Sequence, residues 1–387
     1  MRILLSSNGA HVNTGYGSQS RYLIKAFQEL GHTVLCMPHF GIQGGPTTIN
    51  GILHLPIFRD PWGHDIVGDH VRTYKIDVVL SFHDVWTLSP EFPQSFAGVP
   101  WITYSPVDSI PVPRRLQMIL SEARYVLAMS RFGEREMSRA GIRSTYIPHA
   151  INTDIYCPGD KTAAREEMGV KDKFTVLIAA ANYYYPSRKA FPEQMAAFAE
   201  FHKEFPDSQL LLHTALQPTT GQGGLDMNDL VLSLGLEDCT ANTPEYDIAM
   251  GLSDGRMAQM YRCADVLLGA SFAEGFGLMQ MEAQACGVPI IVHDFGASPE
   301  YLFNGIKVPS SQPFWNLLGC WQAIPSIKGI YEALRELYLN RKCLQEGQRT
   351  YERVKAELSE PYVRDHYWKP FLNSIDQAGE MAMGRIV

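Results

Sequence analysis

At 387 residues the chain is long enough for two domains, and its 45% hydrophobic and 19% charged residues are typical of a globular protein with a full core. The net charge of −8 argues against general affinity for nucleic acid. No apolar run is long enough to span a bilayer and no hydrophobic signal region follows Met1, so we expect a cytoplasmic protein. Seven cysteines, an odd number without metal-ligand spacing, indicate core thiols in a reducing compartment.

The chain opens with the pattern strand, glycine-rich loop, helix, strand. An apolar strand, a polar loop, a helix capped by Ser18 and a second strand are predicted at Arg2–Ser7, Asn8–Gly17, Gln19–Leu30 and His32–Pro38. Glycines in such a loop let the backbone approach an anion, so Gly15 and Gly17 are candidates for an acceptor or phosphate loop. The second strand ends without the acidic residue that would hold a nicotinamide ribose, which disfavours a dehydrogenase.

Polar residues follow two of the next predicted strands. Those strands are Asp77–Phe82, which ends on His83, and Pro100–Tyr104, which Asp108 follows after a short turn. Open α/β sheets bind ligands just past the carboxyl ends of their strands. His83 and Asp108 are therefore candidate catalytic residues on the acceptor side, although each could equally cap a neighbouring helix.

Positive charge is concentrated in the first half of the chain. Between Arg114 and Arg143 there are seven arginines against three glutamates. The pattern is typical of a solvated helix face, and the alternative is a patch for an anionic acceptor or a membrane surface. A peripheral membrane contact through Arg114–Arg143 is therefore an open expectation.

The second half begins with a strand at Thr175–Ala181. Arg188 and Lys189 come shortly before a helix predicted at Pro192–Phe205, and cations at a loop entering a helix can neutralise phosphates. Exposed surface cations are the alternative. Further along, a helix is predicted at Met227–Gly235, a loop at Thr240–Gly255 and a helix at Arg256–Cys263. Three helices are predicted in the C-terminal part of the chain, at Gly329–Asn340, Arg341–Leu358 and Tyr362–Met383.

The most informative stretch is 271–300, between the apolar runs Ala264–Ala270 and Val288–Val292. Short apolar runs bounded by Gly or Pro are typical of buried parallel strands, so the stretch predicts strand, loop, helix, strand. Glu274 lies in the loop. Glu282 takes a helix position where an apolar residue would be the default, so its carboxylate needs a polar partner, a role that ligand hydroxyls would serve.

The motif around these glutamates carries a specific resemblance. Glu274-Gly275-Phe276-Gly277-Leu278, followed by Glu282-Ala283, Ala285, Gly287 and Pro289, resembles the signature of retaining GT-B glycosyltransferases, family 4 (group 1). The segment 126–158 is also similar to the family pattern, with Ala150 and Asn152 as departures. The resemblance implies an α/β fold of two Rossmann-like domains facing across a cleft, with a C-terminal helix that crosses back. The domains would be 1–157 with 362–387, which binds the acceptor, and 158–361, which binds the donor.

The resemblance also implies the chemistry. A sugar would pass with retention from a nucleoside-diphosphate sugar, a UDP- or GDP-sugar, to a glycan, a lipid-linked or another acceptor. Arg188 and Lys189 would hold the diphosphate, Glu282 the ribose and Glu274 the sugar, with the backbone of 275–278 close to the donor. The chain contains no Asp-x-Asp, so we expect neither a metal nor a cofactor. The alternatives are a nucleotide-sugar epimerase on the same frame and a non-catalytic nucleotide-sugar-binding protein.

Overall fold

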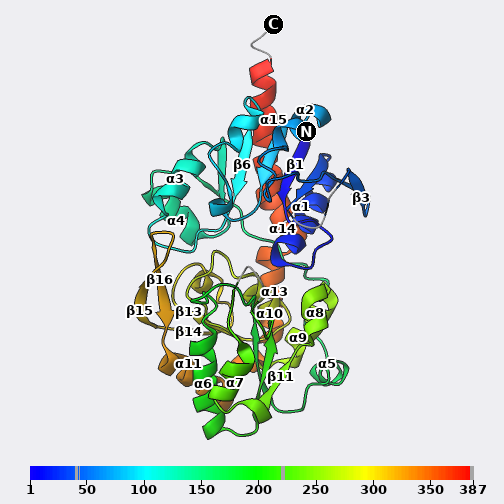
Figure 1. The fold of residues 1–387 in the computed structure, drawn as a ribbon. Helices are drawn as coiled ribbons and strands as arrows, with labels where there is room; N and C mark the ends of the chain where they lie inside the picture. The colour runs from blue at the N-terminus through cyan, green and yellow to red at the C-terminus, as the bar shows by residue number, and fades with distance from the viewer. Residues whose placement is uncertain (40–41, 43, 219–222, 384–387) are drawn as a thin grey trace. The chain divides into compact units, whose positions relative to one another are not determined.

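The computed structural model describes residues 1–39, 42, 44–218 and 223–383. The chain forms two compact units (Figure 1). The first unit contains Met1–Val107, Pro111–Ala150 and Glu357–Val387, and the second contains Asp108–Ile110 and Ile151–Ala356. The main boundary between the units falls between Ala150 and Ile151, seven residues before the boundary expected after Cys157.

The first unit is built on an eight-stranded sheet of order β3-β4-β2-β1-β5-β6-β7-β8. All neighbouring strands are parallel except β3 and β4. The strands are β1 Arg2–Ser7, β2 Thr33–Pro38, β3 Thr47–Ile49, β4 Ile52–His54, β5 Val78–Ser81, β6 Trp101–Tyr104, β7 Tyr125–Ala128 and β8 Thr145–Tyr146. The apolar residues of the central strands are fully buried, which is expected of a parallel sheet covered on both faces.

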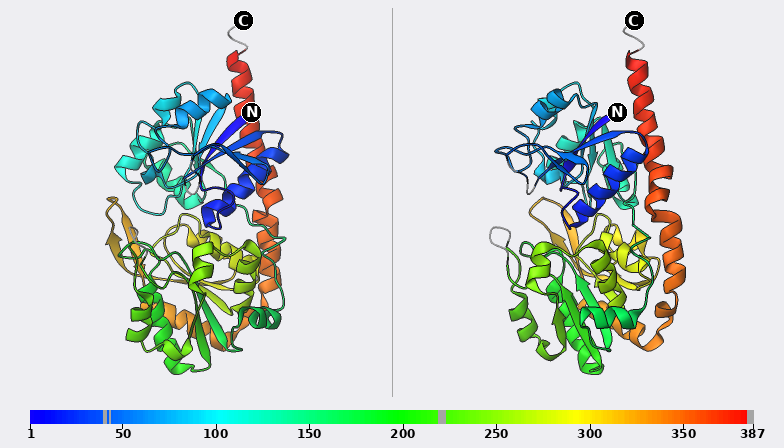
Figure 2. Two further views of the ribbon diagram at one scale, coloured as in Figure 1. Left: turned by 45° about the vertical axis from the view of Figure 1, so that its right-hand side comes forward. Right: turned by 90° about the vertical axis from the view of Figure 1, so that its right-hand side faces the viewer.

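The C-terminal segment belongs to the first unit although it follows the second in the chain. It runs through α14 Glu360–Val363, a π-helical turn at Arg364–Trp368 and α15 Lys369–Met383, drawn in red in Figure 2. Trp368 is fully buried and its ring lies 4.9 Å from that of Phe27 and 5.5 Å from that of Tyr104. Lys25 adds an ion pair to Glu360 at 2.9 Å.

The remaining helices of the first unit connect its strands. They are α1 Gly15–Glu29, α2 Val67–Tyr74, α3 Arg114–Ser121 and α4 Arg131–Arg139, with short 3-10 turns at Val85–Thr87 and Pro93–Phe96.

The first helix begins earlier than the sequence predicted. Thr14, rather than Ser18, is its N-cap and accepts a hydrogen bond from the Gly17 N–H at 3.0 Å. Gly15 and Gly17 therefore lie in the first helical turn and not in the loop. A Cβ at residue 17 would lie 2.0 Å from the Val12 carbonyl oxygen, so this close packing of the loop on the helix requires glycine.

The second unit is built on a six-stranded, all-parallel sheet of order β11-β10-β9-β12-β13-β14. Its strands are β9 Phe174–Ala179, β10 Ser208–His213, β11 Thr240–Asn242, β12 Val266–Gly269, β13 Ile290–His293 and β14 Gly305–Val308. Its helices are α5 Lys161–Met168, α6 Phe191–Glu204, α7 Met227–Ser233, α8 Glu245–Met250, α9 Asp254–Cys263, α10 Leu278–Ala285, α11 Ile327–Asn340, α12 Lys342–Gln345 and α13 Gly347–Leu358, which ends in the first unit. Two parallel α/β units confirm the prediction of two Rossmann-like domains.

Several elements of the second unit differ from the prediction. The loop expected at 240–255 contains β11 and α8, because Thr240–Asn242 extends the sheet beside β10. The helix expected at 341–358 is divided, because Arg341 adopts a left-handed conformation with φ of 49° that ends α11. An antiparallel hairpin, β15 Ser310–Trp315 with β16 Trp321–Pro325, was not predicted at all.

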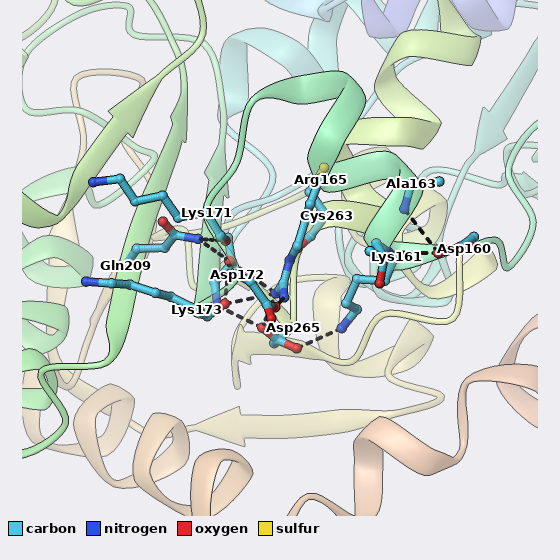
Figure 3. A network of polar contacts seen from close by, with 12 residues as sticks. Asp160, Lys161, Ala163, Arg165, Lys171, Asp172, Lys173, Gln209, Cys263 and Asp265 are labelled. Atoms are coloured by element: carbon cyan, nitrogen blue, oxygen red, sulfur yellow. Dashed lines mark hydrogen bonds and ion pairs between the residues drawn. The ribbon is translucent and has the colours of Figure 1, made fainter.

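A buried polar network fixes α5 to the amino-terminal ends of two strands of the second sheet (Figure 3). Asp265, just before β12, accepts hydrogen bonds from Lys161 at 2.7 Å and from Arg165 at 2.8 Å. It also accepts one from the Thr175 N–H at 2.8 Å, at the start of β9. Its partners come from α5 and from β9, so this network fixes the amino-terminal edge of the sheet, and the opposite edge carries the candidate site.

Candidate functional site

Three strand–loop–helix connections of the second unit meet at the carboxyl ends of β9, β12 and β13. The first carries Arg188 and Lys189 into α6, the second carries Glu274 into α10, and the third contains Gly296 before a short 3-10 helix at Ser298–Tyr301. Loops at this edge of a parallel sheet are the usual place for a ligand. The three loops are also hydrogen-bonded to one another, as the next contacts show.

Glu274 is the centre of a cluster of charges. One carboxylate oxygen accepts a hydrogen bond from the Lys189 ammonium at 2.5 Å, and the other lies 3.2 Å from the Arg188 guanidinium. Arg188 also donates to the Ala273 carbonyl at 2.5 Å. The Glu274 side chain is only 14% exposed, whereas that of Arg188 is 40% exposed and accessible to a ligand.

The protonation of this cluster follows from its surroundings. Burial alone would raise the pKa of Glu274, but the charges of Lys189 and Arg188, with hydrogen bonds from Lys189 and Ser271, lower it to about 2. Burial also lowers the pKa of Lys189, against the opposing effect of Glu274. Glu274 is therefore an anion at any physiological pH and can only accept hydrogen bonds.

Backbone contacts hold Glu274 in place. Its carbonyl accepts a hydrogen bond from the Ala297 N–H at 2.9 Å, and the neighbouring Gly296 has φ of 71°. A Cβ at residue 296 would lie 2.9 Å from that same carbonyl oxygen, so only glycine permits this approach of the two loops. The Phe272 N–H donates to the Arg188 carbonyl at 2.8 Å and connects the loop of Glu274 to the loop that carries Arg188 and Lys189.

The N-terminus of α10 lies directly after Glu274. Gly277 is its N-cap with φ of 93°, and a Cβ there would lie 2.2 Å from the side-chain oxygen of Gln280. The first N–H groups of a helix have no acceptor within the helix, so this terminus attracts an anion. The amide of Gln280 is fixed by donation to the Gly269 carbonyl at 2.9 Å.

Glu282 has the polar partner that its helix position demands. The residue is buried, and the hydroxyl of the fully buried Tyr261 donates to its Oε2 at 2.7 Å. Burial, reinforced by Glu282, raises the pKa of Tyr261 well above its usual range. An internal partner thus satisfies one oxygen without any ligand.

The other motif residues support the loop. Phe276 is buried, with its ring 4.4 Å from that of Tyr301, so its side chain anchors the loop to the 3-10 helix after β13. Gly275 is buried beside it, and Leu278 is partly buried in the first turn of α10.

Asp108 groups with the second unit, whereas the sequence placed it in the first; its catalytic role on the acceptor side stays a prediction. Asp108–Ile110 group with that unit, because Ile110 pairs with Trp321 of β16 through two backbone hydrogen bonds. The Asp108 carboxylate lies 3.8 Å from the Arg188 guanidinium and 3.4 Å from the Gln322 amide. Asp108 therefore joins the cluster around Glu274.

His83 lies in the first unit and is buried at the end of β5. Its Nδ1 lies 2.5 Å from the Thr87 hydroxyl, and its ring centroid is 4.4 Å from that of His39. Burial, with His39 nearby, lowers the pKa of His83 well below its usual value, so the ring is neutral. It contacts Thr87 in the 3-10 turn that follows, and its catalytic role on the acceptor side stays a prediction.

The arginines between 114 and 143 lie on α3, on α4 and in the loops after them. Arg131 and Arg139 form ion pairs with Glu134 at 2.7 Å and Glu136 at 2.5 Å, and Arg131 also covers the ring of Tyr146. Part of this positive charge is therefore neutralised within the unit.

Three residues that position the cluster were not identified from the sequence. Gln194 of α6 donates to the Lys189 carbonyl at 2.6 Å and accepts from the Ala270 N–H at 3.0 Å. His293 at the end of β13 contacts the Ser271 carbonyl at 3.0 Å, and Tyr261 holds Glu282. Gln194, a glutamine on an otherwise apolar helix face, was the one signal that the sequence offered for a buried polar contact. The partners themselves could not be predicted, because they lie up to 76 residues apart in the chain.

Within the described residues, no group of three or more His, Cys, Asp or Glu side chains is arranged to hold a metal ion. In the same part of the chain, no helix is both long and apolar enough to cross a membrane.

Comparison with known proteins gives matches to glycosyltransferases. Residues 242–344 match the family described as glycosyl transferases group 1. D-inositol 3-phosphate glycosyltransferase of Segniliparus rotundus is 27% identical over 74% of this chain and 63% of its own length. The corresponding protein of Mycobacteroides abscessus is 32% identical over 43% of this chain and 36% of its own length. The chain thus spans less than two thirds of these relatives.

Solved structures share the fold across the whole chain. Sucrose-phosphate synthase of Thermosynechococcus elongatus has a TM-score of 0.78 with 16% identity, covering 97% of this chain and 99% of that one. Anabaena HepE in complex with UDP-glucose has a TM-score of 0.71 with 15% identity, covering 96% and 100%. The fold is that of the GT-B glycosyltransferases. Residues 242–344 carry the match to the group 1 family, and the assignment of the chain to family 4 stays a prediction.

Proposed function

We propose that this protein transfers a sugar from a nucleoside-diphosphate sugar to an acceptor, with retention of configuration and without a bound metal. The observation that carries the proposal is the cluster of Arg188, Lys189 and Glu274 beside the N-terminus of α10. A UDP-sugar or a GDP-sugar is the expected donor, and the binding of UDP-glucose by HepE favours UDP. The acceptor is a glycan, a lipid-linked or another hydroxyl compound.

Each part of the cluster would have its own role. The diphosphate would bind to Arg188, Lys189 and the α10 N–H groups, which stabilise the charge that develops on the leaving group. Glu274, held as an anion, would accept hydrogen bonds from sugar hydroxyls. Glu282 would accept hydrogen bonds from the ribose hydroxyls.

The first experiment identifies the donor. Thermal unfolding is measured with UDP, GDP, ADP and their sugars, since a ligand of the folded state raises the midpoint by mass action. Donor hydrolysis and transfer are then followed with the ligand that stabilises most, with excess chelator and with magnesium. Activity that persists in chelator supports metal independence, whereas its complete loss contradicts it. Binding without turnover would indicate a non-catalytic nucleotide-sugar-binding protein instead.

Two variants test the diphosphate site. Arg188→Ala and Lys189→Ala should each weaken nucleoside-diphosphate binding about ten- to a hundredfold, because hydrogen bonds to charged groups are worth about 1.5–3 kcal/mol. Lys203→Ala, an exposed lysine at the far end of α6, is the matched control. Parent-like affinity in both site variants would overturn the assignment.

A further inference from the structure

The hairpin of β15 and β16 is an unusual surface of the second unit. Between Lys307 and Lys328 the sequence contains no charged residue. Four large apolar side chains at its tip are exposed to solvent: Trp315, Leu317, Leu318 and Trp321. In Figure 1 the hairpin stands out from the six-stranded sheet of its own unit. An uncharged, apolar, protruding tip is a feature that soluble proteins avoid unless it has a partner.

The tip is arranged in two levels. Leu317 and Leu318 form the end of the turn, and Leu317 is fully exposed. Trp315 and Trp321 lie one level below, with ring centroids 4.9 Å apart and about half of each side chain exposed. Leucines at the end and tryptophans behind them match the order of side chains from the hydrocarbon to the headgroup level of a bilayer.

The backbone of the tip is also prepared for an apolar environment. The Asn316 N–H donates to the Cys320 carbonyl at 3.0 Å, and the Gly319 N–H to the Asn316 carbonyl at 3.1 Å. The Leu318 N–H donates to the Asn316 side-chain oxygen at 3.0 Å. Polar backbone groups must be satisfied internally once they leave water, and these three hydrogen bonds satisfy three N–H groups of the turn.

The hairpin is held by backbone contacts at Trp321, the first residue of β16, close to the turn. The backbones of Ile110 and Trp321 exchange hydrogen bonds of 3.0 and 2.7 Å. The flanking cations are already paired, Lys307 with Asp294 at 3.0 Å and Lys328 with Glu332 at 3.6 Å. Because the residues between these two lysines carry no charge, we expect binding through the hairpin to be mainly apolar.

We propose that the tip of the β15–β16 hairpin inserts into the interface of a phospholipid membrane and anchors the protein there. A protein partner fits less well. A stable protein–protein interface buries about 800 Å² of surface on each partner, and four side chains on a convex tip provide a smaller contact area than that. The proposal goes beyond the transfer reaction and does not depend on it.

The test uses the full chain and vesicles of phosphatidylcholine, with and without phosphatidylserine, at low and high salt. We expect binding to both vesicle types that persists at high salt, since no free charge is involved. Lipids brominated in the acyl chain should quench the tryptophan emission of the bound protein. The double variant Leu317→Ser and Leu318→Ser should bind on the order of a hundredfold more weakly.

Its matched control is the double variant Leu232→Ser and Leu339→Ser, which removes two exposed leucines of α7 and α11 and should bind like the parent. Unchanged melting of both double variants shows that the fold is intact. Three results would overturn the proposal. The first is that the parent does not bind vesicles. The second is that both the parent and the tip variant bind only anionic vesicles and that salt abolishes this binding, which would assign the binding to the arginines of 114–143; the third is that the parent is a dimer that the tip substitutions dissociate, with no vesicle binding.

Discussion

Replacing Glu274 by glutamine should have opposite effects on binding and on turnover. In the free protein Glu274 occupies the two cations that the diphosphate needs, with contacts of 2.5 Å to Lys189 and 3.2 Å to Arg188. The glutamine keeps the size of the side chain but removes its charge. A free nucleoside diphosphate then meets cations without a competing anion, so its affinity should rise.

The size of this effect can be estimated from the geometry. A phosphate oxygen on the far side of the Lys189 ammonium would lie roughly 5–6 Å from the carboxylate, two hydrogen-bond lengths away. At an effective dielectric constant of about 20, the repulsion between two unit charges at that separation is about 3 kcal/mol. Screening by salt and water reduces it, so we expect free UDP or GDP to bind about tenfold more tightly. Turnover should fall about ten- to a hundredfold, because the sugar loses a charged acceptor.

The assay is calorimetric affinity for the free nucleoside diphosphate beside the rate of donor hydrolysis or transfer. Glu166→Gln, an exposed position on α5, makes the same change in net charge away from the cluster and is the control. Equal or weaker diphosphate binding by a folded Glu274→Gln variant would refute the idea that this carboxylate and the diphosphate share the same cations.

Three further predictions follow from the same contacts. Glu282→Gln should weaken free nucleoside diphosphate and nucleotide sugar alike in calorimetry, because the ribose is common to both; a loss confined to the sugar donor would contradict the ribose assignment. Asp265→Ala should lower the free energy of unfolding by about 3 kcal/mol, because the buried Arg165 loses its buried counterion. Asp172→Ala removes an almost fully exposed partner of the same arginine and should cost less than about 1 kcal/mol in the same denaturant titration; equal losses would contradict this account. Because folding lowers the pKa of Glu274 from 4.5 to about 2, its ion pairs stabilise the fold above pH 4.5 and this contribution is lost as the pH falls towards 2; the parent should therefore lose more stability over that range than Glu274→Gln.

The sequence alone was sufficient for the fold class and for the main loop of the site. Buried parallel strands appear as short apolar runs, and glycines mark the positions where loops approach closely, so 264–292 could be interpreted correctly as strand, loop, helix, strand. Arg188 and Lys189 were placed at the entrance of a helix by the same local reasoning. These features depend on residues that are close together in the sequence, so they can be recognised from the sequence alone.

Local signals were weaker where short elements depend on distant partners. The start of α1 depends on a hydrogen bond from Gly17 to Thr14, and Ser18 offered an equally good cap. The β15–β16 hairpin has no strong turn dipeptide, and β11 is a strand only because β10 lies beside it. Such elements form through tertiary contacts, which override weak local preference.

The tertiary structure alone decided which charges meet. The sequence separated Asp108 from Arg188 by 80 positions and assigned them to different domains, yet the pairing of Ile110 with Trp321 brings them within 3.8 Å. It also gave no indication that Glu274 would neutralise both cations, or that Tyr261 would satisfy Glu282. Ion pairs between loops depend on how the sheet aligns their strands, and that alignment is a property of the folded chain and not of any one segment.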